Sequence, residues 1–568
     1  MARNLIPVQV IRTSSQAVRS ALRKAITPSK FLARAAKLTA RQRALIVQQA
    51  LMILEGLYVN LPHKRAMYAV DPLRRLRLLQ QRLHTHFDND QLFHHEMTQI
   101  FSSLGDLHAN YLLPEPFKDA SAWLPFTVEF CFDEDGKHTF LATKVLKPWF
   151  KGTSFKEGVE ILSWNGVPIG RAVEMAGAQS PSGAGNIVAR HALGLFSLTA
   201  RPLLAMLPPD EEWVTVGYRT RSGGSEQEVR VSWVVSDVPE TQELAPPGIS
   251  VVTAGVQKIR RFLFAPNDTA VFWDEALPVP PYGKIGYLRI YTFDVDDSDE
   301  LVEKLIKAIK KLPQDGLIID IRENPGGRAR AAEQLLQVVA PKLPIEPERL
   351  YLVSTPLTLQ LCRLQKDNPD LGPSGAAPWI KSIERSMQTG APYSASFPYT
   401  DPDACNVEDR PRYPGPVIVI TDGLTRSAAE VFAAGFQDHG GKILGVHATT
   451  SGAGSNARKH TQFAEYFRKA KRSPFKRLPG GADFLVAFRR YLRVGPESGN
   501  DIEDFGVRSD YRHRMTRADL LNSNEDLIRH AVEILRGKEP GPDRGPTHKA
   551  SRRSRYRKRK TRRSRQRA

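Results

Sequence analysis

The feature that most constrains the fold is a pair of unbroken apolar strands, each of which ends in a polar turn. Residues 316–327 read GLIIDIRENPGG and residues 415–423 read GPVIVITDG. Strands that lack apolar–polar alternation are buried on both faces, which is typical of parallel sheets covered by helices. Helical patterns alternate with these strands, and further apolar strands at 283–293, 349–355 and 442–446 extend the series. We therefore predict an α/β region with a central sheet, helices on both faces, and a functional site where the strands end.

The remainder of the chain changes its hydrophobic period from one part to the next. From Thr39 onward the pattern is helical, with Leu45, Ile46, Ala50 and Ile53 on one face. Further along, segments such as PFTVEFCF and HTFLATKVL alternate apolar and polar residues, as short strands do. The predicted organisation is a basic N-terminal segment (1–38), a helical N-terminal domain (39–120), a β domain with an insertion (121–240), the α/β domain (241–538) and a disordered basic tail (539–568).

The net charge of +20 is concentrated at the C-terminal end. Residues 541–568 contain 13 Lys and Arg residues and one Asp, so this tail is a candidate for contact with nucleic acid or an anionic surface. A solvated tail with only nonspecific attraction is the alternative. The three cysteines, Cys131, Cys362 and Cys405, are widely spaced and fit neither a disulfide framework nor a zinc cluster. Residues 1–54 lack acidic side chains, as transit peptides do, but without a secretory or membrane-spanning segment we expect a cytoplasmic location.

Ser427 stands where the second apolar strand passes into the helical pattern of residues 428–438. With Glu430 it forms the S-x-x-E pattern of a capping box, which satisfies free backbone N–H groups at a helix start without any chemistry. The same position also suits a nucleophile, because the N-terminus of a helix stabilises developing negative charge. The local sequence leaves both interpretations open.

The segment HTHFDNDQLFHHE gathers His84, His86, His94 and His95, which raises the question of a metal site. The spacing of these histidines matches no zinc signature, so polar helix and turn residues are the preferred interpretation. We predict no metal and no organic cofactor.

Several segments together resemble peptidase family S41, the tail-specific or C-terminal-processing serine proteases and their tricorn-like relatives. They are GYLRIYTF, GLIIDIRENPGG, TRSAAEVFAAGFQDHG and IEDFGVRSDY, in the family's order, over about residues 100–536. FKEGVEILSWNGVPI resembles the core of a PDZ domain, apart from Val159 where that family usually has Asp. The resemblance implies a ClpP/crotonase-like catalytic domain, a PDZ-like β domain and hydrolysis of peptide bonds.

The resemblance also implies roles for individual residues. Ser427 would be the nucleophile, and an oxyanion hole would form from the Ala428 N–H and the Gly326-Gly327 turn. Many family members use a lysine base about 25 residues after the serine, but Gly452 or Ala453 stands there, and Lys459 comes several residues later.

A second branch of the family uses a histidine from the N-terminal region together with a glutamate near the C-terminus. His108 of the sequence DLH and Glu503 of DIEDFGVRSD match these two positions. Glu497 is a weaker candidate for the acid, and Asp106 is expected to shape its own turn.

The predicted function is therefore that of a serine endopeptidase with Ser427, His108 and Glu503 as its catalytic residues, acting on protein or peptide substrates. The alternatives are a catalytically inactive S41-like protein that binds peptides or proteins, and a nucleic-acid-associated protein that uses its basic tail. An α/β-hydrolase is set aside, because residues 425–429 read TRSAA and lack the G-x-S-x-G pattern. Homo-oligomerisation is compatible with the sequence.

Residues 455–480 are rich in Lys and Arg. We predict that they form a loop-rich insertion that borders the substrate cleft and favours acidic protein segments. A solvated loop is the alternative.

Overall fold

The structure is a computed structural model of the 568-residue chain. It describes residues 16–34, 37–83, 90–180, 185–220, 224–237, 257–260, 263, 270–368, 371–372, 375–470 and 472–538. The predictions for residues 1–15, for His84 and His86, and for the basic tail lie outside the described residues.

The N-terminal region is helical, and its longest helix begins with a capping box. Thr39 Oγ1 accepts from the Gln42 N–H at 3.2 Å, and Gln42 Oε1 accepts from the Thr39 N–H at 2.8 Å. Ile46, Ala50 and Ile53 are buried on the inner face. The helices are α2 (Gln16–Lys24), α3 (Pro28–Leu32), α4 (Ala40–Gly56), α5 (Leu61–Tyr68), α6 (Pro72–Arg82) and α7 (Asp90–Ser102).

The second region is an antiparallel sheet with the order β3-β4-β5-β8-β9, in which β6 also pairs with β5. Asn165 and Gly166 both have positive φ and join β5 to β6, as an Asn-Gly hairpin turn should. The predicted insertion contains two helices that pack on each other, α8 and α9. The bounds are β3 (Phe126–Phe132), β4 (His138–Val145), β5 (Glu160–Trp164), β6 (Val167–Pro168), α8 (Ile169–Gln179), α9 (Ile187–Thr199), β8 (Trp213–Arg219) and β9 (Gln227–Ser232). The 3-10 helix η1 (Lys147–Phe150) follows β4, and β2 (Ala120–Trp123), β7 (Ala200–Pro202) and β10 (Val234–Asp237) form a separate small sheet.

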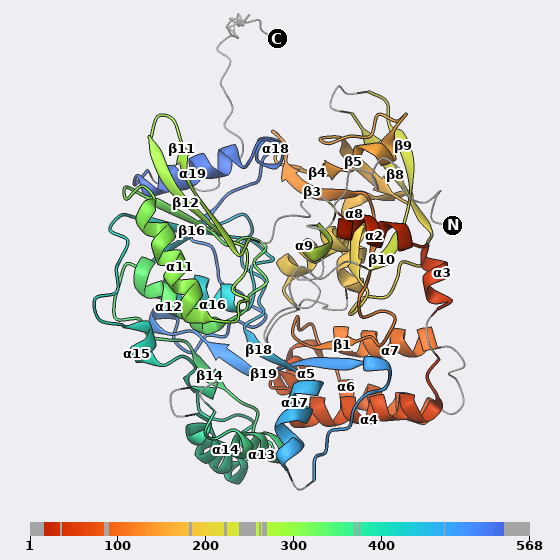
Figure 1. Cartoon of the computed structure of the whole chain (residues 1–568), viewed down its shortest axis with the longest axis vertical. Coiled ribbons are helices and arrows are strands. Elements are labelled where there is room, and N and C mark those ends of the chain that lie inside the picture. The colour runs from red at the N-terminus through yellow and green to blue at the C-terminus, as the bar shows by residue number, and fades with distance from the viewer. Residues whose placement is uncertain are drawn as a thin grey trace, which may run out of the picture.

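The predicted parallel sheet is present, with the order β11-β12-β13-β16-β17-β20. All neighbouring pairs are parallel except β11 with β12. Helices α11, α12 and α16 pack on one face and α19 on the other, so the apolar strands are covered on both sides, as expected (Figure 1). The bounds are β11 (Phe272–Pro278), β12 (Lys284–Ile290), α11 (Ser298–Lys311), β13 (Leu317–Asp320), α12 (Ala329–Val339), β16 (Val417–Thr421), α16 (Ala428–Asp438), β17 (Lys442–Gly445), β20 (Tyr511–Arg512), α18 (Arg517–Leu521) and α19 (Glu525–Leu535).

The strand predicted at 349–355 does not belong to this parallel sheet, so that part of the prediction is wrong. It forms β14 (Arg349–Tyr351), which pairs antiparallel with β19 (Asp483–Leu492) and β15 (Phe397–Pro398). Strands β1 (Asn110–Leu112) and β18 (Ser455–Lys459) also pair with β19. The remaining helices are α13 (Pro356–Leu364), α14 (Ala377–Thr389), α15 (Pro402–Cys405) and α17 (His460–Tyr466), with 3-10 turns η3 (Phe467–Lys469), η4 (Pro479–Gly481) and η5 (Gly495–Glu497).

Residues 455–480 are more regular than the predicted loop. They contain β18 and α17, and Phe463, Phe467 and Phe475 are buried. Gln49 of α4 accepts hydrogen bonds from His460 and from the Lys476 N–H, which joins this segment to the N-terminal helices. The segment is therefore a packing element in this structure, because apolar side chains anchor it.

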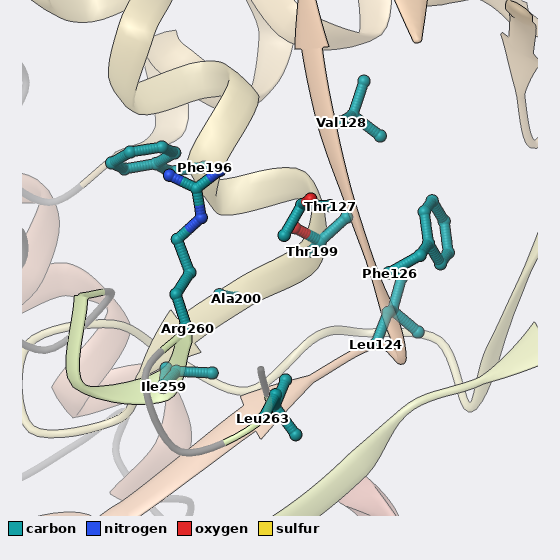
Figure 2. Close-up of a pocket in the computed structure, with 10 residues that line it drawn as sticks. All are labelled: Leu124, Phe126, Thr127, Val128, Phe196, Thr199, Ala200, Ile259, Arg260 and Leu263. Carbon is teal, nitrogen blue, oxygen red and sulfur yellow. The ribbon is translucent and has the colours of Figure 1, made fainter. Parts of the chain in front are cut away.

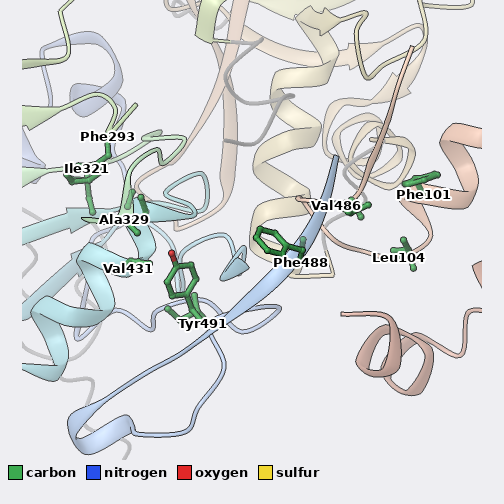
Figure 3. Close-up of a cluster of buried hydrophobic side chains, with 14 of the residues drawn as sticks. Phe101, Leu104, Phe293, Ile321, Ala329, Val431, Val486, Phe488 and Tyr491 are labelled. Atoms are coloured by element: carbon green, nitrogen blue, oxygen red, sulfur yellow. The ribbon is translucent and has the colours of Figure 1, made fainter. Parts of the chain in front are cut away.

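Strand β19 connects the parts of the molecule. It runs from β1, beside the N-terminal helices, to β14, beside the α/β region (Figure 1). Figure 3 shows one hydrophobic cluster that passes from Phe293 and Ile321 of the α/β region, through Phe488 of β19, to Phe101 and Leu104. A shared core of this kind fixes residues from distant segments relative to one another.

All three cysteines are free and buried. Within the described residues, no single helix is long and apolar enough to span a membrane. Helices α4 and α5 together have the required length and composition, but the chain bends by 92° between them.

Candidate active site

Ser427 lies between β16 and α16 and has a strained backbone. Its φ is 54° and its ψ is −126°, whereas a residue that only caps a helix normally has extended angles. Backbone strain of this kind costs on the order of 1–3 kcal/mol and persists only where the surroundings enforce it. A sharp strand-to-helix turn is also the geometry that presents a nucleophilic hydroxyl above the end of a sheet. The backbone of Ser427 thus favours the nucleophile over the simple cap.

Glu430 holds this turn in place. Its Oε2 accepts from the Ser427 N–H at 3.1 Å, as the capping pattern predicts. The same buried carboxylate accepts hydrogen bonds from the hydroxyl groups of Thr450 and Ser451 and from two backbone N–H groups, those of Gly452 at 2.7 Å and Ala453 at 2.8 Å. The segment where some relatives carry a lysine is therefore fixed here to the helix that follows Ser427.

The Gly326-Gly327 turn lies directly beside Ser427. Gly326 has a φ of +99°, and a Cβ there would lie 2.6 Å from Ser427 Cβ and 3.1 Å from the Ala428 nitrogen. Gly327 has a φ of +137°, and its Cβ would lie 2.1 Å from the carbonyl carbon of Phe293. Only glycine fits this approach of two backbones. The two strand ends that the sequence predicts to share a site are thus in contact.

Asn324 binds backbone amides on both sides of this contact. The Gly326 N–H donates to Asn324 Oδ1 at 2.9 Å, and the Arg426 N–H donates to the Asn324 carbonyl at 3.1 Å. Asn324 therefore ties the glycine turn to the residue before Ser427. Asn324 belongs to the segment GLIIDIRENPGG, but no role was predicted for it from the sequence.

On the other side of the site, His108 lies in the loop between α7 and β1 and is fully buried. Asp106 Oδ1 accepts from the His108 backbone N–H at 2.7 Å, and Asp106 Oδ2 accepts from the Tyr58 hydroxyl and from Asn60 Nδ2. Asp106 thus shapes the turn that carries His108, as predicted. Burial raises the pKa of Asp106, but Lys64, His108 and the hydrogen bonds from Asn60 and Tyr58 more than offset this and hold it below its ordinary value.

Glu503 is fully buried and meets His108 in the fold, although the two residues are far apart in the sequence. One side-chain ligand atom each of Asp106, His108 and Glu503 lies within 4.8 Å of the other two. Glu503 Oε1 accepts from Lys64 Nζ at 3.0 Å, and Oε2 accepts from the Ser455 hydroxyl at 2.9 Å. Burial raises the pKa of Glu503, and the Asp106 carboxylate raises it further while Lys64 lowers it, which gives a pKa of about 8.

Residues 450–455 connect the Ser427 side of the site to the Glu503 side. The Ser451 N–H donates to the Thr425 carbonyl at 3.0 Å, close before Ser427. The Gly452 carbonyl accepts from the Asp504 N–H at 2.8 Å, and Ser455 binds Glu503 directly. One short segment therefore contacts both sides.

Four weaker candidates lie elsewhere. Glu497 is exposed in η5 and accepts from Asn500. Lys459 ends β18 opposite Leu485. His94 is buried against the Tyr111 hydroxyl, and His95 bonds to Gln99, so neither belongs to a group of metal ligands among the described residues.

The cluster of Asp106, His108 and Glu503 has the residue types and spacing of a metal site. However, the ammonium group of Lys64 donates to Glu503, so that carboxylate already has a cation beside it. Proton transfer is therefore the chemistry that this donor set suits best.

Two cavities lie beside β3 and α9. The smaller, shown in Figure 2, has a volume of about 10 Å³, with Arg260 placed over the Phe196 ring. It can hold about one water molecule and is too small for a substrate side chain. The larger cavity has a volume of about 240 Å³, and its lining includes Phe130, Leu195 and Leu424. Leu424 comes three residues before Ser427 in the chain.

Comparison with known proteins identifies a peptidase family over part of the chain. The sequence model of peptidase family S41 matches residues 284–472, a range that includes Gly326, Gly327 and Ser427 but neither His108 nor Glu503. No curated protein sequence matches the chain.

Solved structures share the fold over most of the chain. They include mature CPAF (TM-score 0.63, 18% identity), mature CPAF complexed with lactacystin (TM-score 0.61, 17% identity) and a serine-to-alanine mutant of CPAF (TM-score 0.63, 17% identity). Each comparison covers 88% of this chain and 99% of the other. The structural likeness concerns the fold, whereas the family match covers the strands and the turn that carry Ser427. Residues 284–472 therefore match peptidase family S41, a family of serine-type peptidases.

Proposed function

We propose that the chain is a serine endopeptidase in which Ser427 attacks the peptide carbonyl, His108 accepts the hydroxyl proton and Glu503 orients His108. The observation that carries this proposal is the buried group of Asp106, His108 and Glu503, joined to the Ser427 turn by residues 450–455. A histidine held by a carboxylate next to a hydroxyl is the general arrangement of serine peptidases, whatever the order of the residues in the chain.

The expected reaction has two proton transfers. As Ser427 Oγ attacks the carbonyl carbon, its proton passes to His108, and the resulting imidazolium donates a hydrogen bond to the Glu503 carboxylate. His108 then gives the proton to the leaving amine, which departs from the acyl enzyme. Water repeats the sequence and releases Ser427.

The oxyanion is best served by the Ala428 and Gly327 amides. Ala428 is the first residue of α16, where free N–H groups and the helix dipole favour negative charge. The Gly326 N–H is engaged by Asn324, so the contribution of Gly326 is the open space that its missing Cβ leaves in front of Ser427 and Ala428.

The antiparallel sheet is the PDZ-like domain of this proposal. Strand β9 lies at the end of the strand order β3-β4-β5-β8-β9, so its outer edge is where an extended peptide would add as a further strand. This interpretation assigns substrate capture to β9 and hydrolysis to the Ser427 turn.

The inactive alternative is less well supported, because a protein that only binds peptides gains nothing from the strained backbone of Ser427. The decisive test is chemical. A fluorophosphonate probe should label the wild-type protein at Ser427 and abolish hydrolysis of an unfolded protein substrate. The Ser427→Ala variant should show neither labelling nor hydrolysis, and Ser451→Ala, which removes a neighbouring hydroxyl, should retain both. Equal hydrolysis by wild type and Ser427→Ala would refute the proposal.

A further inference from the structure

Lys64 is a fully buried lysine that α5 of the N-terminal region places against the candidate active site. Its Nζ donates to Glu503 Oε1 at 3.0 Å, to Asp504 Oδ1 at 2.5 Å and to the Gly105 carbonyl at 3.3 Å. An ammonium group has three protons, so all of its donors have acceptors. These contacts fix the position of the charge next to Glu503.

Charge balance explains why a cation is needed at this position. Glu503, Asp106 and Asp504 bring three carboxyl groups into a region that is shielded from water. Burial lowers the pKa of Lys64, but Glu503, Asp106 and Asp504 raise it above its ordinary value, so Lys64 remains charged and cannot act as a base. The titratable and charged groups that face Glu503 are Lys64 of α5, Asp106 and His108 of the loop before β1, Asp504 next in the chain, Arg490 of β19, and Tyr58 after α4.

We propose that Lys64 is a positioning residue for the peptidase reaction: its ammonium group favours the ionised form of Glu503 and holds this carboxyl group beside His108. The proposal rests on the proposed function, since it assigns to Lys64 a part of the same site. Lys64 acts through Glu503 and touches neither the substrate nor Ser427.

The proton balance of the reaction shows what Lys64 contributes. When His108 takes the Ser427 proton, a positive charge appears on the imidazolium, and an ionised Glu503 stabilises it. A protonated Glu503 would offer no such charge. Without Lys64, burial and the negative Asp106 would favour the protonated form over a wider pH range. The three protons of Lys64 stay on Lys64 throughout.

The first test replaces Lys64 and follows the pH dependence of kcat/KM. In Lys64→Met the rising limb of kcat/KM should move to higher pH by about two units, which corresponds to about 100-fold lower kcat/KM below the limb. The loss should appear in kcat with KM nearly unchanged, because no substrate contact is removed. Lys64→Arg keeps the charge and should recover at least about tenfold of the lost rate.

A matched control separates this effect from loss of a buried ion pair in general. Arg43 of α4 donates to Asp90 Oδ1 at 2.6 Å, in the same N-terminal region but outside the site. Arg43→Met should lower the melting temperature while leaving the position of the pH limb unchanged. If Lys64 were merely structural, Lys64→Met would behave in the same way, and this result would overturn the proposal.

A double variant keeps the test valid even where Lys64→Met alone folds poorly. Lys64→Met with Glu503→Gln replaces both members of this ion pair by neutral side chains, and Asp504 retains the Tyr68 hydroxyl as a donor. If Lys64 acts through Glu503, the double variant should be no slower than Glu503→Gln alone, within about threefold. An additional loss of about 100-fold would overturn the proposal. Failure of the wild-type protein to hydrolyse substrate and to label at Ser427 would instead overturn the proposed function itself, and with it the role of Lys64.

Discussion

The two sides of the candidate active site are built in different ways. Ser427 comes from one continuous strand–turn–helix unit, β16 and α16, and its neighbour Gly326 follows the adjacent parallel strand β13. The other side is assembled from separated segments: Lys64 of α5, the turn at His108, Ser455 of β18, and Glu503. The Ser427 side is therefore fixed by the sheet, whereas the His108 side depends on tertiary contacts that join the N-terminal helices to the α/β region.

This comparison has a mechanistic consequence. The strain at Ser427 is held by its own helix through Glu430, so changes in the N-terminal region should leave the serine turn intact. The base and its carboxylate have no such local support. They should be the part of the site most sensitive to distant changes.

The largest expected effect tests whether the two sides act as one unit. His108→Gln, which keeps most of the side-chain volume, should lower kcat/KM by about 10⁴-fold or more because the serine loses its base. In the Ser427→Ala background the same substitution should cause almost no further loss, since residues of one catalytic unit are not additive. The measurement is steady-state hydrolysis by variants whose circular dichroism matches wild type. A His108→Gln variant with more than about a tenth of wild-type activity would show that Ser427 does not depend on His108 as its base.

A smaller effect is expected within the Ser427 side. In Gly326→Ala the new methyl group would fill the space next to Ser427 Cβ and the Ala428 nitrogen, where the oxyanion should form. We expect kcat/KM to fall by about 10²–10³-fold, the usual range for damage to an oxyanion hole. Gly390→Ala is the matched control, because Gly390 also has a positive φ of +76° but a Cβ added there would meet no atom within 4 Å. It should lower stability by about 1 kcal/mol and leave kcat/KM unchanged.

If both glycine variants lost activity equally, backbone strain alone would account for the result, and the space in front of Ser427 would have no special role. If neither did, the oxyanion would have to form elsewhere.

The difference between the locally built Ser427 side and the His108 side, which is assembled from distant segments, also decides what could be predicted from the sequence. The apolar strands, the helix after Ser427 and the glycine turn depend on neighbours a few residues away, and their patterns predicted them. The strand at 349–355 could not be placed in its sheet from the sequence, because its main partner, β19, lies more than 100 residues later and leaves no local signal. His108 and Glu503 were found only through the family resemblance.

Lys64 and Ser455 were not predicted at all. Lys64 stands in a helix whose sequence, LPHKRAMY, resembles many solvent-exposed helices. Its acceptors, Glu503 and Asp504, are about 440 residues away, so only the tertiary structure identifies it as a buried charge. The one clue in the sequence is the acidic pair Glu503-Asp504, which needs a cation if it is buried.

Glu333, a buried carboxyl group of the α/β region, can be compared with Glu503. Glu333 of α12 is fully buried, and its Oε1 accepts from the Glu348 N–H at 2.9 Å. Within the described part of the chain no cation is paired with it, in contrast to Glu503 with Lys64. Burial raises the pKa of Glu333 to about 7. Because Glu503 lies beside His108 and Glu333 binds the Glu348 N–H instead, the titration of Glu333 should influence stability, whereas that of Glu503 should govern activity.

The smallest expected effect follows from this difference. The folded protein retains the Glu333 proton up to about pH 7, whereas the unfolded chain releases it near the ordinary value of about 4.3. Stability should therefore fall as the pH rises between these values, by an amount on the order of 4 kcal/mol at most. Glu333→Gln keeps the acceptor for the Glu348 N–H and removes the titration, so its melting temperature should exceed that of wild type at pH 8 and not at pH 4.5. Its kcat/KM should match wild type at both values, because Glu333 binds the Glu348 N–H and is not one of the residues proposed for catalysis. A shifted pH limb of kcat/KM in Glu333→Gln would mean that the two buried carboxyl groups are coupled through the shared core, and that the two sides of the site are less independent than their construction indicates.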